Sequence, residues 1–364
     1  MKNKERLNIV IESGAYTGPE TGPGTYLYNL VKSLSVAEKI DRFYLKDTKP
    51  DLLKRSRIDF RQHNLKKRDF INSLLVRPDV IHRTDMSSHA ANHSAPVITT
   101  VHDICPLVMP ELFDPSKIKV FSLLLEQAVG ESAAIITPSS RTKEDLISFM
   151  SADPDRVHVI REGADEIFVP QTNYQTGLIK ARYSIKRPYI LYVGALDDRK
   201  NIRGLLESYA RISHESPPEL VLAGNTGRMS EPLAGIISRL GLSGMVRHLG
   251  QVPKKALPAL YSGAEIFVWP SLYEGFGLPV LEAMSCASPV ISSASSSIPE
   301  VAGDAAILVD PADTGELAYS MRRVLNDPSL QQSMRERSLV QSAKFSVKNM
   351  ARSTLDLYRK AAFN

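Results

Sequence analysis

Residues 266–284 read Ile-Phe-Val-Trp-Pro-Ser-Leu-Tyr-Glu-Gly-Phe-Gly-Leu-Pro-Val-Leu-Glu-Ala-Met. The first residues of this stretch have the apolar composition of a buried strand. The glycines at 275 and 277 permit backbone geometries that a tight turn needs, and Pro279 suits the first turn of a helix. We therefore expect Glu274 in a turn at the end of a strand and Glu282 about one turn into the following helix.

These two glutamates predict a ligand site. A helix N-terminus carries free N–H groups and a positive dipole end, so it favours a phosphate. Carboxylates accept hydrogen bonds from sugar hydroxyls. A phosphate site with Glu274 and Glu282 beside it indicates a nucleotide-sugar site. In the alternative interpretation Glu274 is a solvated loop residue and Glu282 a helix-surface residue, which the spacing alone would allow but the intervening residues 275–279 disfavour.

The rest of the chain alternates strand-like and helical stretches, which predicts an α/β fold. Its 364 residues favour two domains. Strand candidates lie at 7–11, 43–45, 80–82, 97–101, 134–137 and 157–160, with helical stretches at 26–34, 117–129 and 142–150. A looser polar segment spans 170–188. The alternation restarts at 189–193 and continues at 220–222, 246–249, 266–268, 290–292 and 306–309, and a capping-box pattern at 313–316 predicts a helix to about 325.

Composition excludes several classes of function. The net charge of +5 is modest, the basic residues are scattered, and no nucleic-acid-binding motif is present, so we expect no nucleic-acid partner. No run approaches the roughly twenty apolar residues of a membrane span, and the N-terminus lacks the apolar core of a signal peptide. Cys105 and Cys286 lie far apart without metal-ligand spacing. We expect both to be free thiols in a reducing cytoplasm.

One basic segment is an exception to this scatter. Residues 49–77 hold nine Lys or Arg and three Asp, with leucines and phenylalanines interleaved. A basic amphipathic segment of this kind can lie on an anionic membrane surface, which would place the protein at the inner face of the plasma membrane. It can equally be a solvated connection that covers its own domain's core, and the pattern leaves both interpretations open.

Three further motifs carry chemistry. Gly22 and Gly24 precede a helical stretch, where glycine lets the backbone approach an anionic ligand. The basic pair Arg199-Lys200 follows the strand at 189–193, where paired cations can stabilise a leaving diphosphate. His102 and Asp103 lie at the end of the strand at 97–101, the edge where open α/β sheets bind ligands. His82 and His89 have weaker claims and are expected to be structural or to lie on the acceptor side.

Together these motifs resemble the retaining glycosyltransferases of family 4, and the region 102–141 resembles the bacterial O-antigen mannosyltransferases among them. The resemblance implies the GT-B fold, in which two Rossmann-like domains face each other across a cleft and the last helix crosses back to the first domain. It implies an acceptor-side domain at 1–170 together with 347–364, and a donor-binding domain at 188–345.

The resemblance also implies roles for individual residues. Glu274 would contact hydroxyls of the transferred sugar and Glu282 those of the ribose. Arg199 and Lys200 would hold the diphosphate, and His102 would approach the donor sugar, with Asp103 orienting its imidazole or contacting the acceptor. The remaining donor-binding positions are expected to be Gly22, Gly24, Gly224, Gln251, Val252, Gly275, Phe276, Gly277 and Leu278.

The implied reaction is hexose transfer, with mannose from GDP-mannose favoured, to a saccharide or lipid-linked saccharide acceptor in bacterial surface polysaccharide synthesis. No Asp-x-Asp motif is placed to hold a metal-bound diphosphate, so we expect no metal and no cofactor. Many relatives carry Arg where this chain has Ala195, which leaves more of the phosphate charge to Arg199 and Lys200. The alternatives are a family 4 transferase for another nucleotide sugar, an epimerase or phosphorylase on the same fold, and a non-catalytic nucleotide- or glycan-binding protein.

Overall fold

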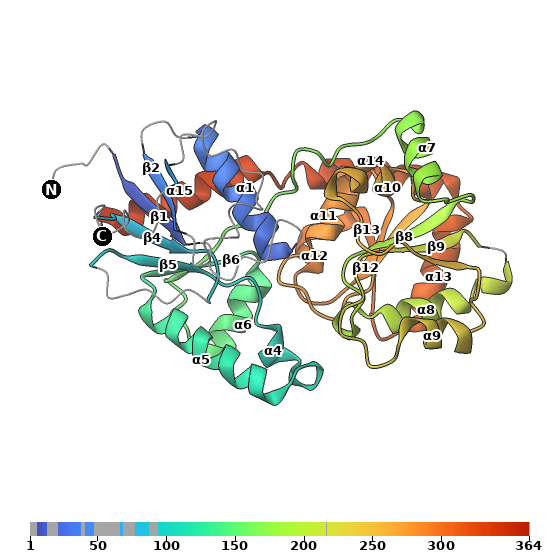
Figure 1. Cartoon of the computed structure of the whole chain (residues 1–364), viewed down its shortest axis with the longest axis horizontal. Helices are drawn as coiled ribbons and strands as arrows, with labels where there is room; N and C mark the ends of the chain where they lie inside the picture. Colours follow the sequence, from blue (N-terminus) through green and yellow to red (C-terminus); the bar gives the residue numbers. More distant parts are fainter. Residues whose placement is uncertain are drawn as a thin grey trace. The chain divides into compact units, whose positions relative to one another are not determined.

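The computed structural model of the chain describes residues 6–12, 21–37, 41–46, 66–67, 77–86, 94–215 and 217–363. These residues form two compact units (Figure 1). The first comprises residues 1–163 together with the C-terminal segment 346–364, and the second comprises residues 164–345. Each unit is built around one parallel β-sheet with helices packed on it.

The first unit has a seven-stranded sheet in the order β3-β2-β1-β4-β5-β6-β7, and every pairing in it is parallel. Its strands are β1 (Asn8–Glu12), β2 (Arg42–Lys46), β3 (Lys66–Lys67), β4 (Val80–Arg83), β5 (Val97–Thr100), β6 (Ala134–Thr137) and β7 (Val157–Val159). The strand order reverses between β1 and β4, which makes this a Rossmann-like sheet. In such sheets, ligands bind at the carboxyl ends of the strands next to the reversal.

The helices of the first unit come from both ends of the chain. Those within the described residues are α1 (Gly22–Ala37), α4 (Cys105–Val108), α5 (Pro115–Glu131), α6 (Ser140–Met150) and α15 (Val347–Phe363), with a 3₁₀ turn η1 (Pro110–Leu112). The C-terminal helix α15 packs against α1 and β4, and its buried residues Val347, Met350, Leu355 and Tyr358 join the core formed by β1 and α1. The last helix therefore completes the first unit, as predicted.

The second unit repeats the same topology. Its six parallel strands follow the order β10-β9-β8-β11-β12-β13. They are β8 (Tyr189–Val193), β9 (Glu219–Ala223), β10 (Val246–His248), β11 (Ile266–Trp269), β12 (Val290–Ser293) and β13 (Ala306–Val309). The order again reverses at the first strand, between β8 and β11. The turns after β8 and β11 therefore meet at one edge of the sheet, and this edge carries the candidate site.

Two groups of helices cover this sheet on opposite sides (Figure 1). One group is α8 (Ile202–Ala210), α9 (Leu233–Arg239) and α13 (Thr314–Leu325). The other is α7 (Asn173–Arg182), α10 (Leu257–Ser262), α11 (Leu278–Ser285), α12 (Ile298–Ala302) and α14 (Pro328–Ser342). The remaining turns are η2 (Asp198–Lys200), η3 (Ser213–Glu215), η4 (Lys254–Ala256) and η5 (Gly303–Ala305).

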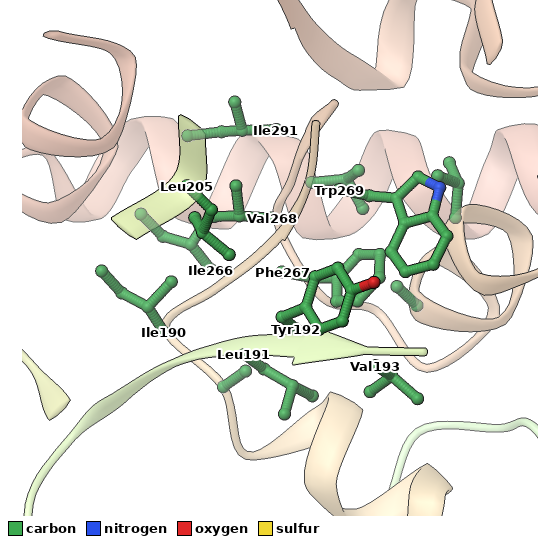
Figure 2. Close-up of a cluster of buried hydrophobic side chains, with 14 of the residues drawn as sticks. Ile190, Leu191, Tyr192, Val193, Leu205, Ile266, Phe267, Val268, Trp269 and Ile291 are labelled. Atoms are coloured by element: carbon green, nitrogen blue, oxygen red, sulfur yellow. The ribbon is translucent and has the colours of Figure 1, made fainter. Parts of the chain in front are cut away.

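The core of the second unit lies directly beneath the candidate site. Both faces of its central strands are buried, so β8 and β11 are continuous apolar runs rather than alternating ones (Figure 2). The rings of Tyr192 and Phe267 stack on Trp269 with centroids 4.9 and 6.1 Å away. The stacked rings of these three residues pack the end of β11 rigidly.

The strand and helix predictions are confirmed in type, with three corrections. The helix predicted at 26–34 begins at Gly22, so Gly22 and Gly24 lie inside α1 rather than before it. The earlier start is stabilised because Thr21 Oγ1 accepts a hydrogen bond from the Gly24 N–H and Pro23 suits the first turn of a helix. The polar segment 170–188 contains α7, which Thr172 and Gln175 begin with a reciprocal capping box. At α13, Glu316 accepts from the Asp310 N–H, so the predicted capping box at 313–316 is not reciprocal.

Two sequence predictions lie mostly or wholly outside the described residues. Of the basic segment 49–77, the structure describes only β3 and Arg77, so its contact with a membrane stays a prediction. His89 is also outside the described residues. Within the described part of the chain, no helix is both long and apolar enough to span a bilayer.

Candidate active site

Glu274 lies where the sequence predicts it, in the turn between β11 and α11, and it is only 7% exposed. The Ser296 hydroxyl accepts from its backbone N–H at 2.8 Å, and the Ser297 hydroxyl donates to its carbonyl at 2.9 Å. Gly277 then starts α11 with φ of +110°, a conformation that other residues rarely adopt. These contacts fix both the turn and the direction of the Glu274 side chain.

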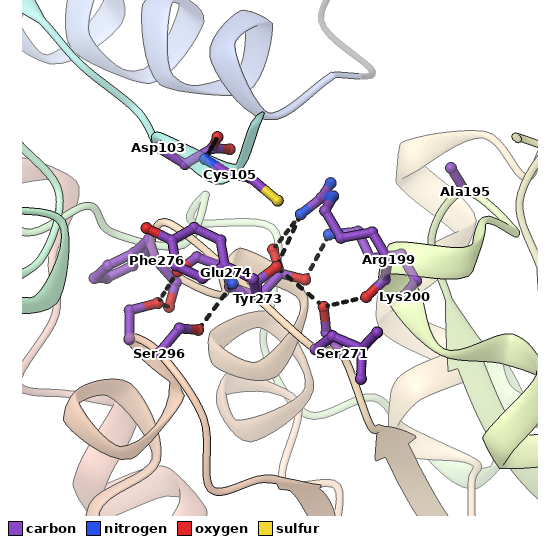
Figure 3. A network of polar contacts seen from close by, with 12 residues as sticks. Asp103, Cys105, Ala195, Arg199, Lys200, Ser271, Tyr273, Glu274, Phe276 and Ser296 are labelled. Carbon is purple, nitrogen blue, oxygen red and sulfur yellow. Dashed lines mark hydrogen bonds and ion pairs between the residues drawn. The ribbon is translucent and has the colours of Figure 1, made fainter. Parts of the chain in front are cut away.

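The basic pair converges on this carboxylate (Figure 3). Lys200 Nζ lies 2.5 Å from Glu274 Oε1, and Arg199 Nη1 lies 3.5 Å from Glu274 Oε2. The Arg199 guanidinium also donates to the Tyr273 carbonyl at 3.0 Å. The two residues predicted for the diphosphate and the one predicted for the sugar therefore form one charged cluster, with a formal charge of +1 when all three are ionised. This cluster is suited to an anionic ligand.

The pKa values follow from this arrangement. Burial on its own raises the pKa of Glu274, but the charges of Lys200 and Arg199 outweigh it, and the pKa falls below its usual value. The pKa of Lys200 is also lowered, chiefly by burial, although Glu274 opposes the change. The surroundings therefore favour the ionised carboxylate of Glu274, whereas Glu274 offsets only part of the cost of burying the Lys200 ammonium.

The side chain of Trp269 also belongs to the site. It is buried, its Nε1–H donates to Glu274 Oε1 at 3.2 Å, and Lys200 Nζ lies 4.8 Å from the centre of its ring. A cation at this distance from an indole face is attracted to it. The position of Trp269 at the carboxyl end of β11 is the signal that could have identified this role.

Glu282 lies on α11, partly buried, and accepts a hydrogen bond at 3.1 Å from the Tyr261 hydroxyl of α10. Its helix begins at the turn that holds Glu274, so both glutamates border the same helix N-terminus.

The turn after β9 lies very close to the turn after β8 at Gly224, where an added Cβ would lie 1.9 Å from the Gly194 carbonyl oxygen. Only glycine allows the turns after β8 and β9 to pack together in this way.

The other predicted donor-binding positions have mixed settings. Gln251 Oε1 accepts from the Asn225 amide at 3.2 Å, and Val252 and Leu278 pack against the core. Phe276 is a core residue rather than a lining one: it is 5% exposed and its ring packs edge-on against Phe345. A ligand contact by Phe276 would thus involve its backbone.

The first unit holds the remaining predicted residues. His102 follows β5, and its Nε2 lies 2.9 Å from the Thr84 carbonyl oxygen, to which it donates. Its Nδ1 lies 3.7 Å from Glu162 Oε1. Burial lowers the pKa of His102, but Glu162, the Thr84 carbonyl and Asp103 together outweigh burial and raise it. The geometry favours an imidazolium at this position.

Asp103 does not make the contact that was expected to orient the imidazole. Its Oδ1 accepts from the Cys105 N–H at 3.0 Å, which begins the helix α4, whereas Glu162 approaches the ring. Sequence reasoning missed Glu162, although it follows β7 at the edge of the sheet where ligands bind. A contact of Asp103 with an acceptor stays a prediction.

His82 has a structural role, which is one of the two roles expected for it from the sequence. It is fully buried, and its ring nitrogens contact the hydroxyls of Tyr358 on α15 at 2.5 Å and Thr100 at 2.8 Å. Burial lowers its pKa to about 3, so it is neutral at physiological pH. Cys105 and Cys286 are buried free thiols, as predicted.

Comparison with known proteins agrees with this fold. Residues 178–339 match the family described as Glycosyl transferases group 1, and residues 22–166 match the one described as Glycosyltransferase Family 4. The O-antigen chain mannosyltransferase B of Escherichia coli is 30% identical over 97% of this chain and 100% of its own length. The MMP alpha-(1->4)-mannosyltransferase of Mycolicibacterium hassiacum is 31% identical over 62% of this chain and 54% of its own.

Solved structures share the fold at low identity. Anabaena Alr3699/HepE, determined in complex with UDP and glucose, superposes with a TM-score of 0.73 at 17% identity, covering 96% of this chain and 99% of that one. Sucrose-phosphate synthase from Thermosynechococcus elongatus superposes with a TM-score of 0.76 at 21% identity, covering 98% and 99%. The two Rossmann-like domains show the GT-B fold, and the mannosyltransferase relative together with the matching family models shows that the chain is a glycosyltransferase. The chain belongs to glycosyltransferase family 4.

Proposed function

We propose that the chain is a retaining mannosyltransferase that moves mannose from GDP-mannose to a growing saccharide, free or lipid-linked, in bacterial surface polysaccharide synthesis. The observation that carries the proposal is Glu274 held by Lys200 and Arg199 at the end of β11. The choice of mannose is supported by the O-antigen mannosyltransferase relative, which aligns over nearly the whole chain. The alternative is a family 4 reaction with another nucleotide sugar.

The charged cluster fits the bond that must break. When the bond between the sugar carbon and the phosphate oxygen cleaves, negative charge grows on the diphosphate and positive charge on the sugar. Arg199 and Lys200 are placed to stabilise the first, and Glu274 to hold sugar hydroxyls and stabilise the second. Because Glu274 already fixes Lys200, little reorganisation is needed at the moment of reaction.

Retention of configuration follows if the acceptor attacks from the face that the diphosphate leaves. The acceptor hydroxyl forms the new bond to the sugar carbon, and its proton passes to a phosphate oxygen of the leaving GDP. This step needs no covalent enzyme intermediate. His102 would approach the donor sugar from the first unit, and Glu282 would accept hydrogen bonds from the ribose.

We further propose that the transfer is metal-independent and that residues 49–77 contact an anionic membrane surface. The first proposal is supported by the lack of an Asp-x-Asp motif in the second unit, which holds Glu274, and by the two cations beside that residue. The second is supported by the nine basic residues among apolar ones in this segment. Vesicles with anionic lipid should bind the protein at low salt and release it at high salt, and salt-insensitive binding would contradict electrostatic attachment.

A ligand panel tests the choice of donor. The protein is titrated with GDP-mannose, UDP-glucose and ADP-glucose, and its melting temperature is recorded. At equal ligand concentrations the donor with the lowest Kd gives the largest shift, and at a hundred times that Kd it stabilises the folded state by about 2.7 kcal/mol. A larger shift with UDP-glucose than with GDP-mannose would reject mannose as the sugar and GDP as the carrier.

A further inference from the structure

The helix α7 packs on the second unit through one of its sides. Thr176, Ile179 and Tyr183 are half-buried, and the latter two pack against the core of this unit. Their spacing of three and four residues places them on one helix face. The Gln171 N–H donates to the hydroxyl of Ser262 on α10 at 3.0 Å, and α7 itself packs on α10. These contacts define the inner face of α7, which lies at the periphery of the second unit (Figure 1).

The opposite, solvent-facing side of α7 is apolar. Tyr174 is 75% exposed and Leu178 is 53% exposed. Gly177 and Ala181 share this face, and an added Cβ on Gly177 would meet no atom within 4 Å. We call these four residues the α7 stripe. A surface helix normally carries polar side chains on its outer face, so the α7 stripe indicates a surface that contacts something other than water.

Two more exposed apolar side chains lie just before this helix. Ile167 is 40% exposed and Val169 is 48% exposed, so residues 167–178 hold four large apolar side chains that face water. In the described part of the chain, no other stretch of this length holds more than two of them. Single exposed apolar residues are normal on any protein surface. Four within one short segment form a concentrated apolar surface.

The same segment carries only positive charge. Residues 167–196 contain four Lys or Arg and no Asp or Glu. The four cations are Lys180, Arg182, Lys186 and Arg187, and the last three are exposed. Arg182 lies one turn beyond Leu178, directly beside the α7 stripe. The neighbouring helix α10 has no charged side chain that could neutralise them. An apolar surface with a basic border is therefore presented to solvent.

We propose that the α7 stripe, together with Ile167, Val169 and the four cations, contacts an anionic membrane surface. Apolar side chains of a helix that lies in the interface enter the boundary between headgroups and acyl chains, while Lys and Arg reach the lipid phosphates. A tyrosine suits the headgroup level because its ring is apolar and its hydroxyl is polar. This contact belongs to the second unit. It is separate from the one proposed for residues 49–77 and does not depend on which nucleotide sugar is the donor.

Charge and chemistry favour a membrane over other partners. In a symmetric dimer the α7 stripe would lie against its own copy, and the four cations would face four more cations, which repel them. A nucleic acid would engage the cations through its phosphates, but it would leave Leu178 and Ile167 in water. An anionic lipid surface offers phosphates to the cations and an apolar boundary to the leucine and isoleucine, so it satisfies both groups.

Vesicle sedimentation with the whole chain tests the proposal. The vesicles contain equimolar phosphatidylcholine and phosphatidylglycerol, and phosphatidylcholine alone is the reference. Tyr174→Gln with Leu178→Gln should raise the lipid concentration for half-maximal binding by roughly tenfold or more, because two large apolar side chains no longer leave water. Arg182→Gln with Lys186→Gln should raise it by about 25-fold, or roughly fivefold for each cation near an anionic surface.

Matched variants control for exposure and for net charge. Leu123→Gln on α5 with Tyr319→Gln on α13 replaces a leucine and a tyrosine that are 56% and 62% exposed elsewhere on the surface. Arg323→Gln with Arg352→Gln removes the same charge from two other exposed positions. Both control proteins should bind the vesicles as the wild type does. All variants alter exposed side chains, and each is first shown to melt cooperatively.

Each outcome supports or overturns the contact. Weaker binding by both α7 variants, with both controls unchanged, supports it. An effect of the cation variant alone would indicate a site for a polyanion and overturn it. A wild-type dimer that the Tyr174→Gln/Leu178→Gln variant converts to monomer, with lipid binding unchanged, would assign the stripe to a second copy instead. Unchanged binding by both α7 variants, with loss on neutralising Lys66, Lys67 and Arg68, would overturn this contact and leave the one at 49–77 intact. Failure of the wild type to bind would overturn both.

Discussion

Replacing Lys200 by methionine should expose how strongly the charged cluster is coupled. Lys200 and Glu274 are both less than 10% exposed, and their charged atoms are 2.5 Å apart. Two unit charges about 4 Å apart attract by roughly 4 kcal/mol at an effective dielectric constant of ~20. Removing one partner of a buried pair costs about 3–5 kcal/mol, and we expect Lys200→Met near the lower limit because Arg199 still faces Glu274.

A double-mutant cycle isolates the pair. We expect Lys200→Met and Glu274→Gln each to destabilise the second unit, and the double variant to be about 3 kcal/mol more stable than the sum of the two single effects predicts. The cost of Lys200→Met should shrink as the pH falls below about 4.5. The sign follows because pairing lowers the pKa of Glu274, so its stabilisation is present above the unfolded value and lost as the carboxyl protonates.

The assay uses the chain's single tryptophan. Trp269 donates to Glu274 and lies beside Lys200, so its emission during urea unfolding reports on the second unit and on the site. The exposed pair Arg203–Glu207 on α8 is the matched control, and Arg203→Met with Glu207→Gln should couple by less than about 1 kcal/mol. Additivity of the Lys200 and Glu274 variants within about 0.5 kcal/mol would refute the pairing.

Three further predictions concern activity. Glu274→Gln should lower kcat by roughly a hundredfold, the loss expected for ~3 kcal/mol of transition-state stabilisation, and should leave GDP binding unchanged. Glu282→Gln should raise the donor KM and weaken GDP binding. Equal loss of GDP affinity, measured by calorimetry, would mean that the sugar and ribose ends are reversed. Glu162→Gln should lower the pKa of His102, so one limb of the pH–rate profile should move to lower pH while the affinity for GDP stays unchanged. A pH–rate profile that does not move would show that Glu162 plays no part in the site. Activity should survive excess chelator, and its loss with recovery on added Mg²⁺ or Mn²⁺ would show that Arg199 and Lys200 do not replace a metal.

The sequence predicts most of the fold because strands buried on both faces are continuous apolar runs. Segments such as Tyr189–Val193 and Ile266–Trp269 are recognisable for this reason. The helix α7 was missed because its large apolar residues Tyr174 and Leu178 are exposed, so its sequence shows no buried face. The start of α1 was misplaced because glycine and proline usually end helices, but here Thr21 provides a cap.

For the site, the sequence identifies residues but not their partners. Glu274, Arg199 and Lys200 could be predicted because each follows a strand or starts a helix, yet their mutual ion pairs depend on which strand ends meet. The contact of His102 with Glu162 joins residues 60 positions apart, and that of Lys254 with Asp165 joins residues 89 apart. Such pairings require the folded sheet order, which local sequence does not specify.

Product analysis tests the central claim most directly. The protein is incubated with GDP-mannose and a set of mannose-terminated saccharides, free and lipid-linked, and the product is examined by proton NMR while GDP release is measured. The account predicts GDP released in step with a new α-mannosidic linkage, since the donor is α-configured. A β-linked product, or transfer from a UDP-sugar but not from GDP-mannose to these acceptors, would contradict it.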